Sequence, residues 1–220
     1  MTARIHDPFR YLGRAVARLK TKGLANTARY IAHVVHERFV SAIVDLRFGG
    51  RICRTNLDGA VYTDGRHTMV HSHYHVLKDI FAQVPISEQD VLVDVGCGEG
   101  RVINFWLSRG LRNPIVGIEF VHNVAQRAKA RYSKYPNVSI VEGDALSNLP
   151  ENGTIFFLYN PFSDETVASF ERIARVRAAT IVYYNNNCMA PFENGSWDIN
   201  PLDRNGIYEF RAAVMTKRAA

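Results

Sequence analysis

A short apolar run that leads directly into a glycine-rich turn constrains the fold of this chain more than any other feature. Residues 91–95 read Val-Leu-Val-Asp-Val, and Gly96, Gly98 and Gly100 follow at alternate positions. An unbroken apolar run of this length predicts a strand that is covered on both faces, as in a parallel sheet. The glycines allow the backbone to turn tightly and to approach a ligand before the next helix begins. The sequence therefore predicts an α/β fold with a ligand site at this turn.

Strand-like and helix-like segments alternate after the glycine turn, and a helix over residues 73–84 precedes it. Five strands joined by four crossovers predict a doubly wound, mostly parallel sheet. Residues 207–214 are a candidate antiparallel edge strand, and about seven strands are expected in all. The expected later strands cover 115–119, 138–141, 154–159 and 179–185, and the expected helices cover 101–109, 123–134 and 164–175.

The N-terminal segment differs from the rest of the chain in charge. Residues 1–50 carry nine Lys and Arg against three Asp and Glu, whereas residues 51–220 carry eighteen of each. Apolar spacings of three and four predict two helices here, over residues 8–20 and 26–47, with a break at Gly23. We expect a basic helical extension that acts as a cap, a lid or a dimer element for the domain formed by residues 51–220. The oligomeric state is left open, a homodimer included. The expected inward positions of the second helix include Tyr30, Val34, Ile43 and Leu46.

Composition argues against several other classes of protein. The three cysteines are odd in number and lack CxxC spacing, so neither a disulfide framework nor a cysteine-ligated zinc site is indicated. The first twenty residues have scattered charges and no uninterrupted apolar core, which argues against a secretory signal and a membrane-spanning helix. We therefore expect a protein of the reducing cytoplasm.

Four predicted strands end in polar residues, and the carboxyl ends of such strands border the ligand crevice of a doubly wound sheet. Asp94 closes the first strand. Glu119 lies twenty-one residues beyond Gly98, where a carboxylate can accept hydrogen bonds from both hydroxyls of a ribose. Asp144 could border an adenine or cap the following helix. Asn160 could face the reacting centre or initiate an Asn-Pro turn.

These ordered motifs resemble those of class I S-adenosylmethionine-dependent methyltransferases. The segments that carry the resemblance are 91–101, 117–119, 141–145 and 157–162, within residues 73–187. The resemblance implies S-adenosyl-L-methionine as the cofactor. It implies that Asp94 orients the methionine amino group, that Gly96 and Gly98 pack against methionine and ribose, and that Glu119 holds the ribose diol, while Asp144 and Ala145 border the adenine.

The segment ahead of the first strand, with His73, Tyr74 and Leu77, is similar to bacterial members of this class that distantly resemble non-SET histone lysine methyltransferases. In those proteins an upstream segment that contains a tyrosine closes over the cofactor. The expected cofactor-binding residues are therefore Tyr74, Asp94, Gly96, Gly98, Gly100, Glu119, Asp144, Ala145 and Asn160.

The fourth strand end departs from the pattern of amino-group methyltransferases. Those enzymes typically carry Asp/Asn-Pro-Pro-Tyr/Phe, whereas this chain has Asn160-Pro161-Phe162, one proline short. Their amine specificity is therefore not carried over. We expect a small polar acceptor, a hydroxyl oxygen of a saccharide or related metabolite, with Asn160 in a catalytic role. The expected substrate-binding residues are Phe162, Tyr184, Asn185 and Asn187.

Other functions remain as alternatives. A protein lysine or glutamine methyltransferase, or a nucleic-acid methyltransferase, could use the basic extension for guidance, although no stable nucleic-acid complex is expected. A noncatalytic S-adenosylmethionine-binding module would carry the same cofactor motifs. A nicotinamide dehydrogenase is disfavoured because Gly100 falls one residue early for the GxGxxG fingerprint. Trp197 could stack on a sugar or base, but packing in the core is the simpler interpretation.

Four histidines at alternate positions, His67, His71, His73 and His75, raise the question of a metal site. Their spacing suits ligands on a strand or loop, but no neighbouring cysteine or paired carboxylate completes a site, so no metal is expected. His71 or His73 could instead act as a general base on an acceptor hydroxyl. We expect His73 to share the catalytic role with Asn160.

Overall fold

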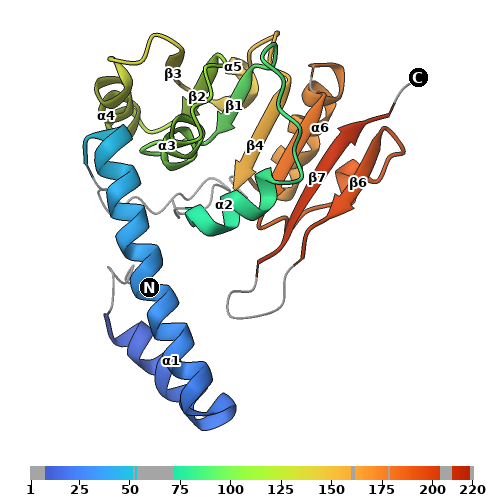
Figure 1. Ribbon diagram of the computed structural model, residues 1–220. Helices are drawn as coiled ribbons and strands as arrows, with labels where there is room; N and C mark the ends of the chain where they lie inside the picture. Colours follow the sequence, from blue (N-terminus) through green and yellow to red (C-terminus); the bar gives the residue numbers. More distant parts are fainter. Residues whose placement is uncertain are drawn as a thin grey trace.

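The computed structural model describes residues 8–51, 53, 72–159, 162–177, 179–203 and 210–218. Within these residues the fold is built on one sheet of seven strands in the order β3-β2-β1-β4-β5-β7-β6 (Figure 1). The first five strands run parallel, and β7 pairs antiparallel with both β5 and β6. This confirms the expected doubly wound, mostly parallel sheet. The strands are β1 Leu92–Val95, β2 Ile115–Glu119, β3 Val138–Glu142, β4 Ile155–Tyr159, β5 Thr180–Tyr184, β6 Trp197–Pro201 and β7 Ala212–Lys217.

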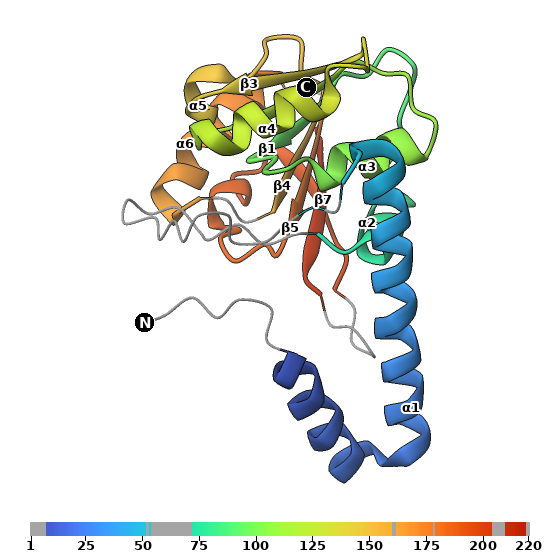
Figure 2. The same ribbon diagram turned by 90° about the vertical axis from the view of Figure 1, so that its left-hand side faces the viewer.

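Helices cover both faces of the sheet, as Figure 2 shows for α2 and α3 on one side and α5 and α6 on the other. Because β1, β4 and β5 are covered on both faces, their residues are almost uniformly buried. This explains the unbroken apolar runs in the sequence. The helices are α1 Pro8–Gly49, α2 Tyr74–Phe81, α3 Arg101–Ser108, α4 His122–Tyr132, α5 Ala145–Asn148 and α6 Asp164–Arg177, with a 3-10 turn, η2, at Ala190–Phe192.

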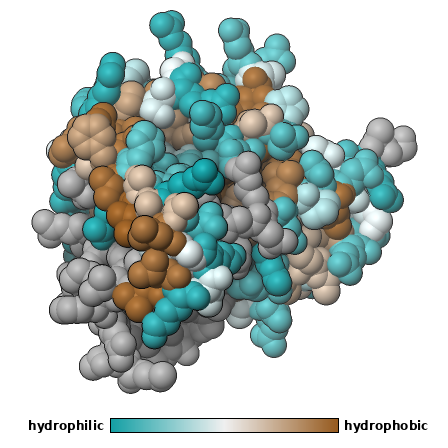
Figure 3. All heavy atoms as spheres, turned by 60° about the horizontal axis from the view of Figure 1, so that its bottom comes forward, coloured by the Kyte–Doolittle hydropathy of each residue, from teal (hydrophilic) through white to brown (hydrophobic). Residues whose placement is uncertain are grey.

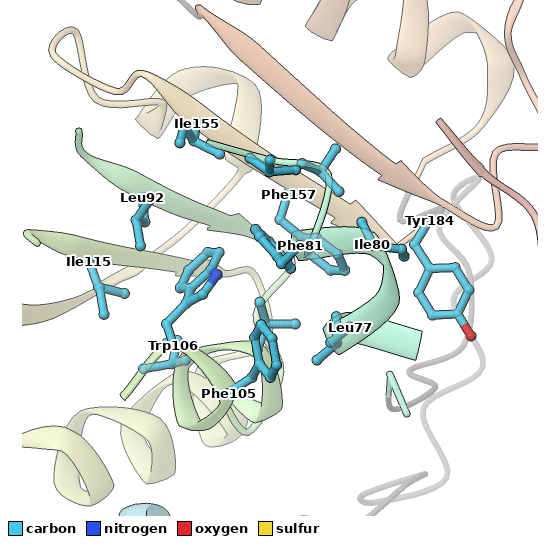
Figure 4. Packing of buried hydrophobic residues seen from close by; sticks show 14 of the residues in the cluster. Leu77, Ile80, Phe81, Leu92, Phe105, Trp106, Ile115, Ile155, Phe157 and Tyr184 are labelled. Carbon is cyan, nitrogen blue, oxygen red and sulfur yellow. The ribbon is translucent and has the colours of Figure 1, made fainter. Parts of the chain in front are cut away.

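Aromatic rings join α2, α3 and β4 on one face of the sheet (Figure 4). The ring of Phe81 in α2 lies 5.4 Å from that of Phe105, 5.8 Å from that of Trp106 and 6.0 Å from that of Phe157, measured between centroids. Offset and edge-to-face contacts at these separations add about 0.5–1.5 kcal/mol per pair to the burial of the rings. The cluster therefore fixes α2 against the sheet.

The antiparallel end of the sheet differs in detail from the expectation. The expected edge strand at residues 207–214 is found as β7, which begins only at Ala212, and residues 204–209 lie outside the described part of the chain. β6 was not expected as a separate strand. Its first residue, Trp197, is 2% exposed and its indole Nε1 donates to Glu171 Oε1 at 3.0 Å. Trp197 therefore packs in the core.

The N-terminal segment forms α1, which is interrupted at Gly23 (φ 77°, ψ 173°), as expected from the sequence. Tyr30 is buried as predicted and Val34 is half-buried, but Ile43 and Leu46 are 46% and 53% exposed, so two predicted inward positions are wrong. The helix is rotated so that Asp45, which lies between them, faces the domain. The exposed apolar side chains of α1 form a stripe, which consists of Leu24, Ile31, Val35, Phe39, Ile43 and Leu46.

Hydrophobic side chains gather in a band on the face that Figure 3 brings forward from the bottom of Figure 1.

The role of α1 as a cap, a lid or a dimer element stays a prediction. No helix in the described residues combines the length and the apolar character needed to cross a membrane.

A fully buried carboxylate, Asp45, holds α1 to the rest of the chain. Its Oδ2 accepts from Arg101 Nη2 at 2.8 Å and from the Cys53 amide at 3.0 Å, and its Oδ1 accepts from Tyr74 Oη at 2.5 Å and from Asn104 Nδ2 at 3.2 Å. Burial alone would raise the pKa of Asp45, but the charge of Arg101 and these hydrogen bonds outweigh it and lower the pKa. One carboxylate thus connects α1, α2 and α3.

We expect Asp45→Asn to lower the free energy of unfolding by about 3–5 kcal/mol, because it leaves the largely buried guanidinium of Arg101 without its countercharge. The matched control is Asp198→Asn, which breaks an ion pair of 2.6 Å with Arg218 in which both side chains are exposed. That control should cost no more than about 1 kcal/mol. Urea denaturation measures both variants, and equal losses would contradict the role assigned to Asp45.

Candidate cofactor site

The glycine turn between β1 and α3 has a backbone that only glycine adopts easily. Gly96, Gly98 and Gly100 have φ values of 76°, 55° and 84°, in the left-handed region that is costly for other residues. A Cβ at Gly100 would also overlap the ring and hydroxyl of Tyr132. The Gly96 amide donates to Ile118 O at 2.9 Å, which ties the start of the turn to the end of β2. The turn is therefore held in one conformation beside the strand that carries Glu119.

Both carboxylate oxygens of Glu119 accept backbone hydrogen bonds. Oε2 accepts from the Gly98 amide at 2.9 Å and Oε1 from the Val121 amide at 2.8 Å. The side chain is buried at the end of β2, so it cannot swing into solvent. Each carboxylate oxygen has two lone pairs and can accept more than one donor. This geometry fits two ribose hydroxyls, and the ribose role of Glu119 stays a prediction.

Asp94 presents an unsatisfied carboxylate oxygen at the same place. The residue is 3% exposed, and its Oδ2 is buried with no hydrogen-bond partner among the residues that the structure describes. Burial, followed by the nearby charge of Glu119, raises the pKa of Asp94 to about 8. A buried polar atom without a partner is costly. An ammonium group would satisfy this oxygen and offset the repulsion from Glu119, so the residues present fit the amino-acid part of S-adenosylmethionine.

The end of β3 joins the same site through the backbone. The Gly143 amide donates to Glu119 O at 3.0 Å. Asp144 Oδ2 accepts from both the amide and the hydroxyl of Ser147 at 3.1 Å, so Asp144 caps α5. Ala145, the first residue of that helix, is buried. The cap interpretation of Asp144 is confirmed, and its place beside the adenine, with that of Ala145, stays a prediction.

Tyr74 is the first residue of α2, and His73 is its N-cap residue. The hydroxyl of Tyr74 is committed to Asp45, and its ring centroid lies 5.5 Å from the guanidinium carbon of Arg101. Its role toward the cofactor stays a prediction. His73 retains exposed surface, yet desolvation by the surrounding protein, followed by the charges of His75 and Arg101, lowers its pKa to about 4. Its imidazole is therefore neutral at physiological pH.

The ends of β4 and β5 carry the residues expected to meet the acceptor. Asn160 lies outside the described residues, as do His67 and His71. Phe162 is buried, with its ring centroid 6.1 Å from that of Phe170, so it belongs mainly to the core. Tyr184 is also buried, whereas Asn185 and Asn187 are exposed just beyond β5. The structure thus brings two of the four expected substrate-binding residues to the surface at this edge.

A buried ion cluster behind the glycine turn was missed by the sequence analysis. Glu99 is 1% exposed, and its carboxylate oxygens lie 3.2 Å from Arg51 Nη2, 3.5 Å from Arg127 Nε and 3.4 Å from Arg131 Nη2. The arginines come from distant parts of the chain, so no local spacing reveals the cluster. Two of the arginines, Arg127 and Arg131, belong to α4, so the cluster joins the turn to that helix.

Comparison with known proteins agrees with this geometry. Residues 92–180, from β1 to the start of β5, match the family described as methyltransferase domain. The chain contains a class I S-adenosylmethionine-dependent methyltransferase domain. No curated protein matches the chain.

Solved structures share the fold of this methyltransferase at low sequence identity. An RNA methyltransferase from Salinibacter ruber, in complex with S-adenosyl-L-homocysteine, is 18% identical with a TM-score of 0.54 over 69% of this chain and 96% of that chain. The putative methyltransferase yhhF from Escherichia coli is 18% identical with a TM-score of 0.56 over 80% and 97%. A methyltransferase from Pyrococcus furiosus is 7% identical with a TM-score of 0.56 over 84% and 98%. These structures share the fold. The family match gives the enzyme class and implies S-adenosylmethionine as the cofactor, and the acceptor is not determined.

We expect the affinity for S-adenosylhomocysteine to rise with pH up to about 8, because the Asp94 carboxyl must lose its proton to pair with the ligand ammonium group. Asp94→Asn should bind weakly and lose this pH dependence. Calorimetric titration at several pH values measures the affinity of the wild type and of the variant for S-adenosylhomocysteine. Methylthioadenosine, which lacks the amino-acid part, serves as the control ligand and should show no such rise.

The stability of the same variant separates lost binding from unfolding. Because the folded-state pKa of Asp94 is raised, its ionisation costs the folded protein stability increasingly as pH rises from about 4 to about 8. Asp94→Asn should therefore be at least as stable as the wild type at pH 8. Affinity for S-adenosylhomocysteine that does not change with pH would contradict the role of Asp94.

Proposed function

We propose that this methyltransferase transfers a methyl group to a small polar acceptor, a hydroxyl oxygen of a saccharide or related metabolite, bound at the carboxyl ends of β4 and β5. The observation that carries the proposal is the pair of stacked tyrosines, Tyr159 and Tyr184, beside the exposed amides of Asn185 and Asn187. These residues lie at the carboxyl ends of β4 and β5, at the same edge of the sheet as Asp94 and Glu119. Doubly wound folds bind their ligands at this edge.

The two tyrosines stack on each other at the ends of β4 and β5. Tyr159 and Tyr184 are paired in register across β4 and β5, and their rings stack with centroids 4.2 Å apart and planes 13° from parallel. Burial raises the pKa of both phenols, and a hydrogen bond joins them. Figure 4 shows the hydroxyl of Tyr184 directed away from the core cluster. Both phenols stay protonated at neutral pH, so neither can serve as the base for an acceptor hydroxyl.

The two asparagines supply the complementary groups. An amide side chain both donates and accepts, which suits a molecule with several hydroxyls. Asn185 has a left-handed backbone (φ 54°), and its amide donates to Arg211 O at 2.7 Å, while the Asn187 amide donates to Asn185 O at 2.9 Å. Backbone hydrogen bonds thus fix the chain at residues 185–187, and the side chains of Asn185 and Asn187 are left exposed.

When bound, S-adenosylmethionine would supply the methyl group on its positively charged sulfur to the acceptor oxygen, with the hydroxyl proton passing to a base or to water and S-adenosylhomocysteine left as the second product. The protein has mainly to align the two molecules and exclude water, and positioning of this kind can lower a barrier by about 7–11 kcal/mol. We assign alignment of the cofactor to Asp94 and Glu119, and orientation of the hydroxyl to Asn160 and the neutral His73.

The acceptor is tested by transfer of labelled methyl from S-adenosylmethionine to separate panels of saccharides, small metabolites, RNA and protein. We expect product in the saccharide or metabolite panel. Asn187→Ala should raise KM for that acceptor about tenfold, for a loss of one or two hydrogen bonds, with little change in kcat. Asn200→Ala, on the outer strand β6, is the matched control and should leave KM unchanged.

Preferential methylation of RNA or protein would overturn the proposed acceptor and favour the alternative guided by the basic extension. Deleting that extension is not a clean test, because Asp45 belongs to it. The charge-reversal variant Lys20→Glu with Lys22→Glu changes only exposed side chains of α1 and tests that guidance directly.

A further inference from the structure

Three side chains that commonly bind metals converge between α1 and α2, and the cofactor site uses none of them. His33 and Glu37 lie one helical turn apart on α1, so they share a face of the helix. His75 reaches them from the first turn of α2. One ligand atom from each side chain lies within 4.8 Å of the other two. In the part of the chain that the structure describes, no other group of three His, Cys, Asp or Glu meets this spacing.

The geometry points to a divalent transition-metal site, best matched to zinc, formed by His33, Glu37 and His75. Imidazole nitrogen and carboxylate oxygen are the ligands with which zinc and neighbouring first-row metals combine in proteins. Three protein ligands leave one position of a tetrahedron open for water or a small ligand. This proposal departs from the expectation of no metal, and it is independent of the acceptor proposed above.

The side chains need only small movements to reach bonding distances. His75 Nδ1 and Glu37 Oε2 already lie 2.7 Å apart, and the rings of His33 and His75 meet edge to face with centroids 4.9 Å apart. With bonds of about 2.0–2.2 Å to a tetrahedral metal, ligand atoms lie about 3.4 Å from one another. Opening the shortest separation and closing the widest requires shifts of about 1 Å, which side-chain rotation supplies without moving either helix.

The surroundings suit a bound cation. Glu37 is buried, and His33 and His75 are half-buried, so the ligands are held by packing rather than free in solvent. Glu37 shares a face of α1 with His33 and faces His75 across the interface with α2, which places donor atoms from both helices around one point. A metal there would join α1 to α2 at a second place, in addition to the contact between Asp45 and Tyr74. His73 lies beside the group, with its ring centroid 5.6 Å from that of His75.

The test is calorimetric titration of zinc into the full chain after removal of metals with a chelator. We expect one zinc per chain and a melting temperature that rises with zinc concentration. His33→Gln, Glu37→Gln and His75→Gln should each weaken binding at least tenfold and abolish the rise in melting temperature. His36→Gln is the matched control, because His36 is an exposed histidine of the same helix turn outside the group. It should bind zinc within about twofold of the wild type.

The circular dichroism and melting temperature of each variant without metal show that it is folded, so that loss of binding is not loss of structure. Cobalt substitution adds a readout that does not depend on activity, since its visible spectrum reports a site with nitrogen and oxygen ligands. The proposal is overturned by an absence of saturable zinc binding in the wild type. It is equally overturned if the three variants bind as the wild type does, or if His36→Gln loses binding to the same extent.

Discussion

The placement of the N-terminal helix depends on one buried charge. Asp45 is surrounded by donors from α2, α3 and the Cys53 backbone, and its partner Arg101 begins α3, the helix that follows the glycine turn. The ion pair therefore couples the position of α1 to the start of the cofactor site. Removing one member of such a buried pair leaves an uncompensated charge. The C-terminal end of α1 is therefore tied to α2 and α3, even though the apolar stripe of the helix is exposed.

At the cofactor site the fold holds two carboxylates, Asp94 and Glu119, close enough to repel each other. The parallel register places Asp94 beside Gly117 and brings β1 next to β2, so that the charge of the buried Glu119 carboxylate acts on the buried Asp94. Glu119 is stabilised by two backbone amides, whereas one oxygen of Asp94 has no partner in the described structure. An ammonium group would satisfy that oxygen of Asp94, and the role of Glu119 toward a ribose diol stays a prediction. The unpartnered oxygen of Asp94 is a cost to the free protein.

Much of this could be predicted from the sequence, because the features involved are local. The apolar run 91–95, the alternate glycines and the acid twenty-one residues beyond Gly98 each depend on short stretches of chain, and they predicted the fold, the turn and the positions of Asp94 and Glu119. Contacts between distant segments could not be predicted. Asp45 with Arg101, Glu99 with three arginines, and His33 and Glu37 with His75 are joined only by the packing of helices. Ile43 and Leu46 were misplaced because a buried ion pair, not apolar periodicity, sets the rotation of α1.

The most direct test of this account is calorimetric titration of S-adenosylmethionine, S-adenosylhomocysteine and NAD into the wild type, Glu119→Ala and Glu142→Ala. Glu142 is paired in register with Glu119 on the neighbouring strand but binds His122 and Gln126 on the surface, so it is the matched control. The account predicts that both sulfur ligands bind the wild type and NAD does not. It predicts a loss of about 1.5–3 kcal/mol in Glu119→Ala and no loss in Glu142→Ala. Folded wild-type protein that binds neither sulfur ligand would contradict it.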